Sequence, residues 1–259
     1  MPYANNEGVK IYYEVAGEGP PLVFVHGAMG NISMWTGYGY VDRLMDQYKL
    51  ILIDARGHGK SEKVYDPVAY DGKPMVDDVI AVLDQAGIAQ THYWGFSMGG
   101  YMGFGLAKYY PHRLLSLILG GASPYIDADD PNQPNPLLDA MRRGVEEGVE
   151  AMIAGYRVWS GGYLHPTSEE RLRSLDPRAM VALFEYWSQK ESLEAILPTM
   201  TMPCLLYIGD HDDPDHVLTY AKLMPNVSTL VLPGLNHAQT SAAVDLIVPR
   251  ALAFLATGK

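Results

Sequence analysis

Short apolar runs alternate with longer stretches of helical spacing along this 259-residue chain. The runs lie at residues 22–25, 50–53, 92–94, 114–119, 204–208 and 229–232. Each predicts a strand buried on both faces, and residues 9–15 predict one more strand at an antiparallel edge. Between the runs, apolar residues recur three or four positions apart, as at Met75, Val79 and Leu83. The alternation predicts an α/β fold in which helices cover both faces of a mostly parallel central sheet.

One interval, residues 124–203, breaks this alternation because it contains no convincing buried strand. Its first dozen residues are polar and rich in proline, a composition that excludes regular helix or sheet. Helical spacing then follows at residues 137–158 and 168–190. We therefore expect residues 124–203 to form a mostly helical cap, inserted into a core domain made of residues 1–123 and 204–259. Both connections leave the core at strand ends, so the cap should lie above the carboxyl ends of the strands, where such sheets bind ligands.

Composition narrows the classes of partner. Hydrophobic residues make up 48% of the chain, which is enough for a sizeable core. The 19 basic residues against 30 acidic residues give a net charge of -11. This balance argues against binding to nucleic acid or to anionic membranes. We expect a soluble, cytoplasmic protein for three reasons. The chain has a single cysteine, its start does not resemble a secretory signal, and its apolar runs are too short to span a membrane.

The first candidate for chemistry is the pentapeptide at residues 95–99, Gly-Phe-Ser-Met-Gly, which fits the pattern G-x-S-x-G. It follows an apolar run and precedes a helical segment at residues 101–110. A serine on such a tight strand-to-helix turn is held exposed, and the flanking glycines permit a strained backbone and close packing. The N–H of Met98 would lie at the start of the helix, where it is free to bind an oxyanion. The simpler alternative is that Ser97 only caps the helix.

A serine nucleophile needs a base, and the base needs a carboxylate to orient it. Three aspartates, Asp210, Asp212 and Asp213, follow the apolar run at residues 204–208, and His237 follows the next run. The order serine, aspartate, histidine is that of one specific triad architecture. Of the eight histidines, His237 alone both follows a strand and lies downstream of the acid. The pattern by itself leaves open which aspartate is the acid.

A second oxyanion donor is expected in the loop after an early strand. The sequence His26-Gly27-Ala28 follows the first apolar run, and the N–H of Ala28 is the candidate donor. His26 is expected to brace this loop rather than to transfer protons. Arg56 and His58 lie in a glycine-rich loop after the second run, and we expect structural roles for both.

In the order and the spacing of these segments, the chain resembles the α/β-hydrolase fold superfamily. Within it, the chain resembles the small capped branch of esterase-like and lactonase-like enzymes. The resemblance runs from about residue 9 to the C-terminus and is weakest in the cap. It implies that Ser97 is the nucleophile, His237 the general base and Asp212 the orienting acid, with Ala28 and Met98 as oxyanion donors. Asp212 is selected because the family usually places this acid three residues after the glycine that ends its strand.

The resemblance also implies a reaction. Relatives that attack a carbon atom, the dehalogenases and epoxide hydrolases, use aspartate as the nucleophile, whereas a serine attacks a carbonyl and gives an acyl-enzyme that water resolves. We therefore expect hydrolysis of small to medium apolar carboxylic esters or lactones, with no cofactor. One departure is Asn236, because the family commonly has glycine before the histidine, and a changed loop conformation is expected there.

Bulky residues of the cap predict an apolar substrate pocket. Together with residues of the catalytic loops, six positions are expected to contact the substrate: Met29, Tyr125, Trp159, Phe184, Trp187 and Leu235.

Other hypotheses compete with this one. The acids and histidines at residues 211–216 resemble a metal site, but neighbouring residues of one loop cannot all converge on one ion, and no metal is expected. C–C bond hydrolases, perhydrolases and hydroxynitrile lyases reuse the same triad, so the sequence leaves them open. A non-catalytic receptor of the same fold is disfavoured, because a receptor needs only the pocket. The sequence does not predict the oligomeric state.

Overall fold

The computed structural model describes residues 3–124, 135–187, 189 and 191–257. Its strands are β1 (Tyr3–Asn6), β2 (Val9–Ala16), β3 (Pro21–Val25), β4 (Lys49–Ile53), β5 (Thr91–Phe96), β6 (Leu114–Gly120), β7 (Cys204–Gly209) and β8 (Val227–Leu232). They form one sheet in the order β1-β2-β4-β3-β5-β6-β7-β8. Strands β3 to β8 run parallel, and β1 and β2 are antiparallel additions at one end. The predicted α/β fold with a mostly parallel sheet is confirmed.

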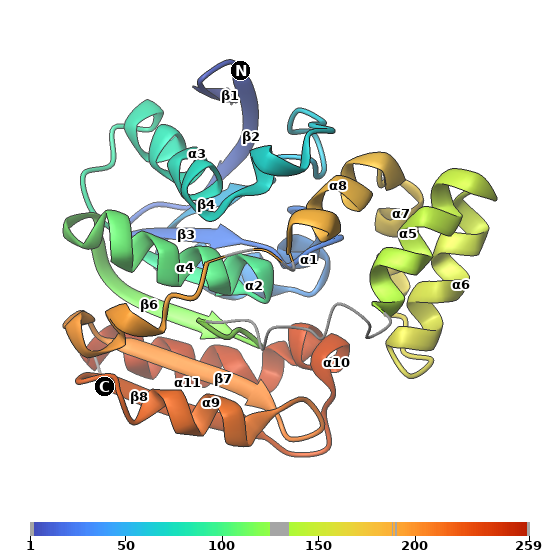
Figure 1. Ribbon diagram of the computed structural model, residues 1–259. Coiled ribbons are helices and arrows are strands. Elements are labelled where there is room, and N and C mark those ends of the chain that lie inside the picture. Colours follow the sequence, from blue (N-terminus) through green and yellow to red (C-terminus); the bar gives the residue numbers. More distant parts are fainter. Residues whose placement is uncertain (1–2, 125–134, 188, 190, 258–259) are drawn as a thin grey trace.

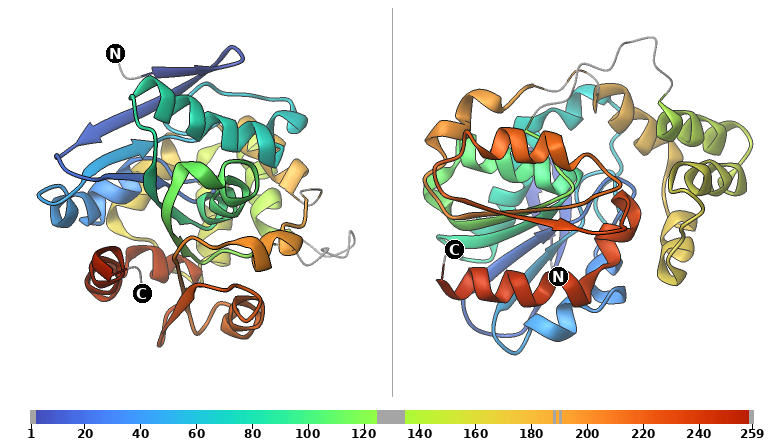
Figure 2. Two further views of the ribbon diagram at one scale, coloured as in Figure 1. Left: turned by 90° about the vertical axis from the view of Figure 1, so that its left-hand side faces the viewer. Right: turned by 90° about the horizontal axis from the view of Figure 1, so that it is seen from below.

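Helices cover both faces of the sheet (Figures 1 and 2). Those of the core are α1 (Ser33–Gly37), α2 (Tyr40–Leu44), α3 (Gly72–Gln85), α4 (Met98–Tyr109), α9 (Pro214–Ala221), α10 (His237–Ala242) and α11 (Val244–Thr257), with 3₁₀ turns η1 (Pro67–Tyr70) and η2 (Pro111–Arg113). A third 3₁₀ turn, η3 (Glu194–Thr199), precedes β7. Apolar side chains of α3, α4 and α9 share one buried cluster, whereas those of α2 and α11 join a second cluster. The core members of the two clusters lie on the two sides of the sheet, as a doubly covered parallel sheet requires, and the first cluster continues into the helices between β6 and β7.

Two details differ from the sequence expectation at the edges of the sheet. Strand β8 is only partly buried, although its apolar run predicts burial on both faces, because it is the last strand and pairs with β7 alone. Strand β1 is not signalled by apolar residues. It pairs with β2 through a tight turn at Glu7 and Gly8, both with positive φ (49° and 97°), and such turns match the twist of a hairpin.

Between β6 and β7 the described residues form four longer helices: α5 (Pro136–Glu146), α6 (Val149–Trp159), α7 (Pro166–Arg173) and α8 (Pro177–Trp187). Each of the two long helical patterns in this interval is therefore a pair of helices. The first is interrupted at Gly148, whose φ of 99° is outside the helical region, and the second stops before Pro177. The four helices lie beside the arrowheads of the strands in Figure 1, at the carboxyl edge of the sheet.

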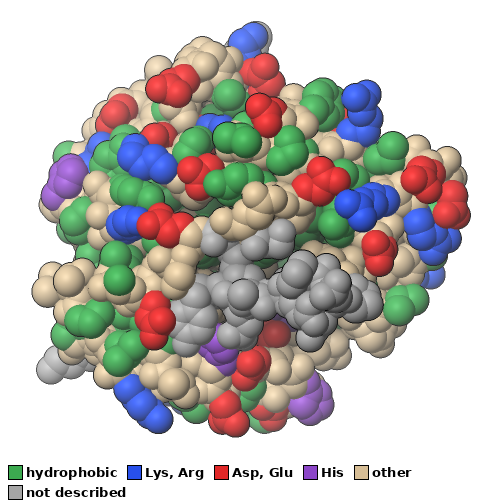
Figure 3. Space-filling model, in the orientation of Figure 1, with side chains coloured by type: hydrophobic (Ala, Val, Ile, Leu, Met, Phe, Trp, Pro, Cys, Tyr) green, Lys and Arg blue, Asp and Glu red, His purple; other side chains and the backbone are tan. Residues whose placement is uncertain are grey.

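Charged side chains are interspersed on the surface. Acidic and basic groups lie next to one another on the face shown in Figure 3. Most described ion pairs join partly exposed side chains, and such pairs contribute little to stability. Within the described residues, no helix is both long enough and apolar enough to cross a membrane.

Candidate active site

Ser97 occupies a strained turn between β5 and α4. Its backbone has φ 53° and ψ -115°, one of the few positive φ values of a non-glycine residue among the described residues. Its N–H donates to the carbonyl oxygen of Gly120 on the neighbouring strand β6, over 2.8 Å. Backbone strain of this kind costs free energy and persists only where the surrounding structure holds it, which is common at functional sites.

The glycines around Ser97 are required by close backbone packing. A Cβ atom on Gly95 would lie 2.2 Å from the carbonyl oxygen of Gly99, and one on Gly99 would lie 2.2 Å from that of Val25. Both distances are far inside van der Waals contact. A side chain at Gly99 would therefore push the turn away from β3, and one at Gly95 would push the start of α4 away from β5; either change would move Ser97.

His237 is the first residue of α10 and meets Asp212, which lies in the turn after β7. The Nδ1 of His237 donates to Oδ2 of Asp212 over 2.6 Å. Aromatic rings of Phe96 and Trp159 flank the imidazole, with centroids 5.0 and 5.8 Å from its own. The bond to Asp212 fixes the tautomer that leaves the other ring nitrogen, Nε2, free to accept a proton.

The other acids of the crowded loop face different partners. Asp210 accepts the N–H of Gly234 through Oδ1, over 2.7 Å, and so joins the loops after β7 and β8. Asp213 caps α9 by accepting the N–H of His216. Among the three aspartates that the pattern leaves open, the structure brings Asp212 to the histidine. The described residues contain no group of three or more histidine, cysteine or carboxylate side chains arranged to hold a metal ion.

The residue before the histidine, Asn236, needs no unusual backbone. Its φ of -86° and ψ of 178° are extended, so the left-handed conformation that asparagine tolerates is not used there. Its side chain caps α10 by accepting the N–H of Gln239, whose own side chain accepts the N–H of Asn236. The Nδ2 of Asn236 also donates to the carbonyl oxygen of Ser160, at the end of α6, over 3.1 Å.

The loop after β3 brings Ala28 and Met29 beside Ser97. A Cβ atom on Gly27 would lie only 3.1 Å from the Cβ of Ser97, so the loop approaches the serine closely. The N–H groups of Ala28 and Met98 donate no hydrogen bond to any other described residue. Both groups therefore have free donor capacity next to Ser97.

Two buried neutral histidines hold this loop in place. The Nε2 of His26 accepts the N–H of Ala55 over 3.1 Å, and its Nδ1 donates to the carbonyl oxygen of Gly27. In the same way His58 accepts the N–H of Met29. Burial lowers the pKa of His26 to about 4 and that of His58 to about 3, so both rings are neutral near pH 7.

Arg56 is likewise structural. It forms a bidentate, buried ion pair with Asp78 of α3, in which Nε and Nη2 each lie 2.6 Å from a carboxylate oxygen.

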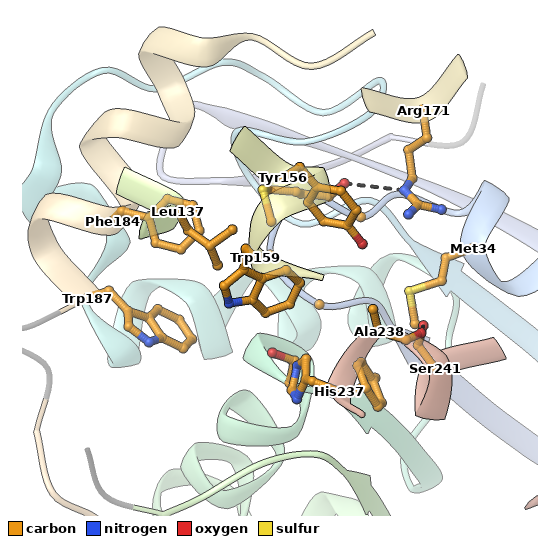
Figure 4. Close-up of a pocket in the computed structure, with 16 residues that line it drawn as sticks. Met34, Leu137, Tyr156, Trp159, Arg171, Phe184, Trp187, His237, Ala238 and Ser241 are labelled. Carbon is orange, nitrogen blue, oxygen red and sulfur yellow. Dashed lines mark hydrogen bonds between the residues drawn. The ribbon is translucent and has the colours of Figure 1, made fainter. Parts of the chain in front are cut away.

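A cavity of about 130 Å³ joins the serine and the histidine to the helices between β6 and β7 (Figure 4). Around Ser97 and His237 it is lined by Gly27, Ala28, Met29, Gly30, Phe96, Ser97, His237, Ala238 and Ser241. From α1 and α5 to α8 it is lined by Met34, Leu137, Tyr156, Trp159, Arg171, Phe184 and Trp187. Asp212 lies behind His237 and is not part of the wall.

The sequence-based list of substrate contacts agrees with this wall in part. Met29, Trp159, Phe184 and Trp187 line the cavity, whereas Tyr125 lies outside the described residues. Leu235 is not part of the wall, which corrects the expectation. Its side chain packs against the apolar cluster on the α2 and α11 side of the sheet instead.

Several polar or flexible wall positions are not among the six expected substrate contacts; they include Met34, Tyr156, Arg171 and Ser241. Burial raises the pKa of the Tyr156 hydroxyl to about 12, so it remains protonated at neutral pH. Periodicity gave no signal for Arg171, because α7 is otherwise polar and has another arginine two positions on.

Comparison with known proteins agrees with this architecture. Residues 20–239 match the family described as alpha/beta hydrolase fold. The chain belongs to that family and is a hydrolase-fold enzyme. It is 27% identical over 267 residues to the non-heme chloroperoxidase CPO-A1 of Kitasatospora aureofaciens, a match that covers 89% of this chain and 90% of the relative.

Solved structures show the same fold at low sequence identity. An esterase from Rhodococcus sp. ECU1013 superposes with a TM-score of 0.84 at 23% identity and covers 100% of this chain and 99% of its own. The enol-lactonase from Burkholderia xenovorans LB400 superposes with a TM-score of 0.82 at 22% identity and covers 98% and 100% of the two chains. Esterase-like and lactonase-like hydrolases are thus the structural neighbours of this chain.

Proposed function

We propose that this protein is a serine hydrolase that cleaves carboxylic esters or lactones of small molecules through an acyl-enzyme. The observation that carries the proposal is the hydrogen bond of 2.6 Å between His237 and Asp212, with His237 in the wall of the same cavity as the strained Ser97. The esterase and the enol-lactonase among the structural neighbours support the choice of substrate class.

In the proposed mechanism, Ser97 Oγ attacks the carbonyl carbon while Nε2 of His237 takes its proton. Asp212 holds the imidazole in the required tautomer and stabilises the imidazolium ion that forms. The intermediate then expels the alcohol, which receives the proton from His237. Water attacks the acyl-enzyme with His237 again as the base, and the carboxylic acid leaves.

The oxyanion of each tetrahedral intermediate would be bound by the backbone N–H groups of Ala28 and Met98. Two features support this role. Both groups have free donor capacity, and Met98 starts α4, where the helix dipole favours negative charge. Since the buried histidines fix the loop of Ala28, its donor would be in place before the reaction begins.

Residues 124–203 would act as a cap domain over the core of residues 1–123 and 204–259. The wall residues Leu137, Trp159, Phe184 and Trp187 from this interval support the idea. Since they enclose the space above Ser97, the cap would exclude water and select the substrate.

Covalent trapping tests the proposed nucleophile. A fluorophosphonate probe reacts only with an activated serine, so we expect mass spectrometry to find one adduct, on Ser97. His237→Ala should lose the adduct because no base activates the serine, whereas Asp213→Asn, on the same loop as Asp212, should keep it. An adduct on another serine, or ester hydrolysis that persists in Ser97→Ala, would contradict the proposal.

The relative named as a non-heme chloroperoxidase favours one second candidate, in which hydrogen peroxide replaces water in the last step. The acyl-enzyme would then yield a peroxy acid. Measuring peroxy acid formation from an ester or carboxylic acid with hydrogen peroxide tests this candidate. It fails if hydrolysis is the only outcome at high peroxide concentration.

A further inference from the structure

The cavity above Ser97 contains a buried positive charge that the proposed triad chemistry does not use. Arg171, on α7, is 7% exposed and forms part of the cavity wall. Figure 4 shows its guanidinium beside Met34, whereas Leu137, Phe184 and Trp187 lie at the opposite end of the cavity. The wall thus has an apolar, aromatic end and an end that carries a cation.

The partners of Arg171 are all neutral. Its Nε donates to the carbonyl oxygen of Met29 over 3.3 Å, its Nη1 to the hydroxyl of Tyr38 over 3.3 Å, and its Nη2 to Oγ of Ser168 over 3.0 Å. A guanidinium has five N–H donors, so one N–H on each Nη atom has no partner among the described residues. No described carboxylate forms an ion pair with it.

Arg56 shows what this fold does with a buried arginine that serves structure alone. Arg56 is buried to a similar degree, at 4% exposed, but Asp78 neutralises it through two hydrogen bonds of 2.6 Å. A buried charge without a counter-ion is costly, because its hydration is lost and no Coulomb attraction offsets the loss. The unpaired guanidinium in the cavity wall therefore has the properties of a site for an anion that arrives with a ligand.

A second polar group points toward the same end of the cavity. Tyr156, on α6, is 8% exposed, and its hydroxyl makes no hydrogen bond to another described residue. In Figure 4 its ring lies between Trp159 and Arg171, with the hydroxyl directed toward the side of Arg171 and Met34. A guanidinium fork together with a hydroxyl donor suits the two oxygens of a carboxylate.

We propose that Arg171, assisted by Tyr156, binds a free carboxylate of the substrate, so that the preferred substrates are esters or lactones that carry a second, ionised carboxyl group. The inference rests on the proposed hydrolase function and specifies its substrate class. The apolar end of the cavity then holds the rest of the molecule. The apolar pocket expected from the sequence did not include this charged end.

Matched substrate pairs test the proposal. Monomethyl esters of succinic, glutaric and adipic acid would be compared with the methyl esters of the corresponding monoamides, in which a neutral carboxamide replaces the carboxylate. Acid release in a pH-stat gives kcat/KM for each compound. For the best pair we expect the wild-type enzyme to prefer the carboxylate about 10- to 100-fold, the range of a charge-assisted hydrogen-bonded contact.

Variants assign that preference to a residue. Arg171→Met should bring the ratio of kcat/KM within a pair close to one, and Arg171→Lys should retain part of it. Because Arg171 also holds the Met29 loop, its loss can slow both substrates, but a merely structural role would not change their ratio. Arg173→Met is the matched control, since Arg173 lies on the same helix, is exposed and pairs with Glu150 and Glu169. Its ratio should equal that of the wild type.

A binding measurement covers the case in which Arg171→Met does not fold or no methyl ester is cleaved. Calorimetry with the Ser97→Ala protein should show that glutarate or adipate binds and that the monoamide binds at least about 10-fold more weakly. A wild-type ratio near one, an unchanged ratio in Arg171→Met, or equal binding of diacid and monoamide would overturn the proposal. If instead Ser97→Ala still hydrolyses the esters while Arg171 controls the ratio, the serine mechanism fails and the carboxylate site stands.

Discussion

The two walls of the cavity are built in different ways. On the core side, Ser97, Ala28 and Met29 belong to loops that pack backbone against backbone, with no space for a side chain at Gly95 or Gly99. On the side of the proposed cap (the cap side), helices α5 to α8 reach the cavity through long side chains. Polar contacts such as those from Arg171 to Met29, from Asn236 to Ser160 and between Tyr38 and Ser168 join the two sides.

In the proposed mechanism, this difference between the two walls separates two tasks. Chemistry requires catalytic groups to be placed within fractions of an ångström, which close backbone packing provides. Selectivity requires a surface whose shape and charge can vary without disturbing the catalytic groups, which side chains on a separate set of helices provide. Changes on the core side should therefore reduce the rate for every substrate, and changes on the cap side should alter the order of substrate preference.

The largest effects are expected at the proposed nucleophile and the proposed base. Ser97→Ala or His237→Ala should lower kcat by about four to six orders of magnitude for every ester tested, because triad members act as a unit. Steady-state kinetics with circular dichroism as a check of folding measures this. Retention of more than a tenth of the activity by either folded variant would show that the chemistry lies elsewhere.

Asp212→Asn should lower kcat by roughly 10⁴-fold, since an amide favours the wrong tautomer of His237. Asp210→Asn and Asp213→Asn are the matched controls on the same loop, and they should keep most of the activity because their partners are Gly234 and His216. If Asp213→Asn lost its activity and Asp212→Asn kept it, the acid that orients His237 in catalysis would not be Asp212.

On the cap side, alanine at Trp159, Phe184 or Trp187 should enlarge the apolar end of the cavity and shift preference toward longer acyl chains. The shift in relative kcat/KM should be about 10- to 200-fold at most, since a methylene group in a hydrophobic pocket contributes about 1–3 kcal/mol. Profiles across esters of increasing chain length measure it. Unchanged profiles with a lower melting temperature in all three variants would mean that these rings only hold the helices in place.

The smallest effect concerns the pH dependence of stability on the core side. The folded-state pKa values of His26 (about 4) and His58 (about 3) lie below the ordinary 6.5, so the unfolded chain binds protons first as pH falls. The contribution of these two neutral rings to the stability of the folded state is complete above about pH 6.5 and is lost as pH falls toward 4 and below. Each histidine can change the folding equilibrium by up to about tenfold per pH unit in this range. His58→Gln should flatten the decline in urea-unfolding midpoints, whereas His112→Gln, at an exposed position, should leave it unchanged. An equal decline in both variants would exclude this role for His58.

Much of the architecture was predictable from local patterns. Apolar runs and helical spacing identified the parallel strands and the helical interval between β6 and β7, because backbone hydrogen bonding imposes fixed periods on buried side chains. The order of Ser97, the aspartate loop and His237 was enough to place these groups at one edge of the sheet, since parallel strands end on the same side. The predictions failed at the edges of the sheet, for the existence of β1 and for the burial of β8. There the number of neighbouring strands, rather than the apolar content of the segment, decides whether a strand forms and how far it is buried.

Tertiary structure alone decided which of several chemically equivalent side chains face the cavity. Arg171 and Arg173 lie two positions apart on one polar helix, yet the first is buried in the cavity wall and the second pairs with surface glutamates. Asp212 meets His237 while Asp210 and Asp213 face other partners, and Leu235 packs against an apolar cluster of the core rather than lining the cavity. The sequence by itself determined the residues of the proposed triad and their order, because these depend on residue type and on position along the chain. The environment of each group depends on how segments distant in sequence pack together, which only the folded structure specifies.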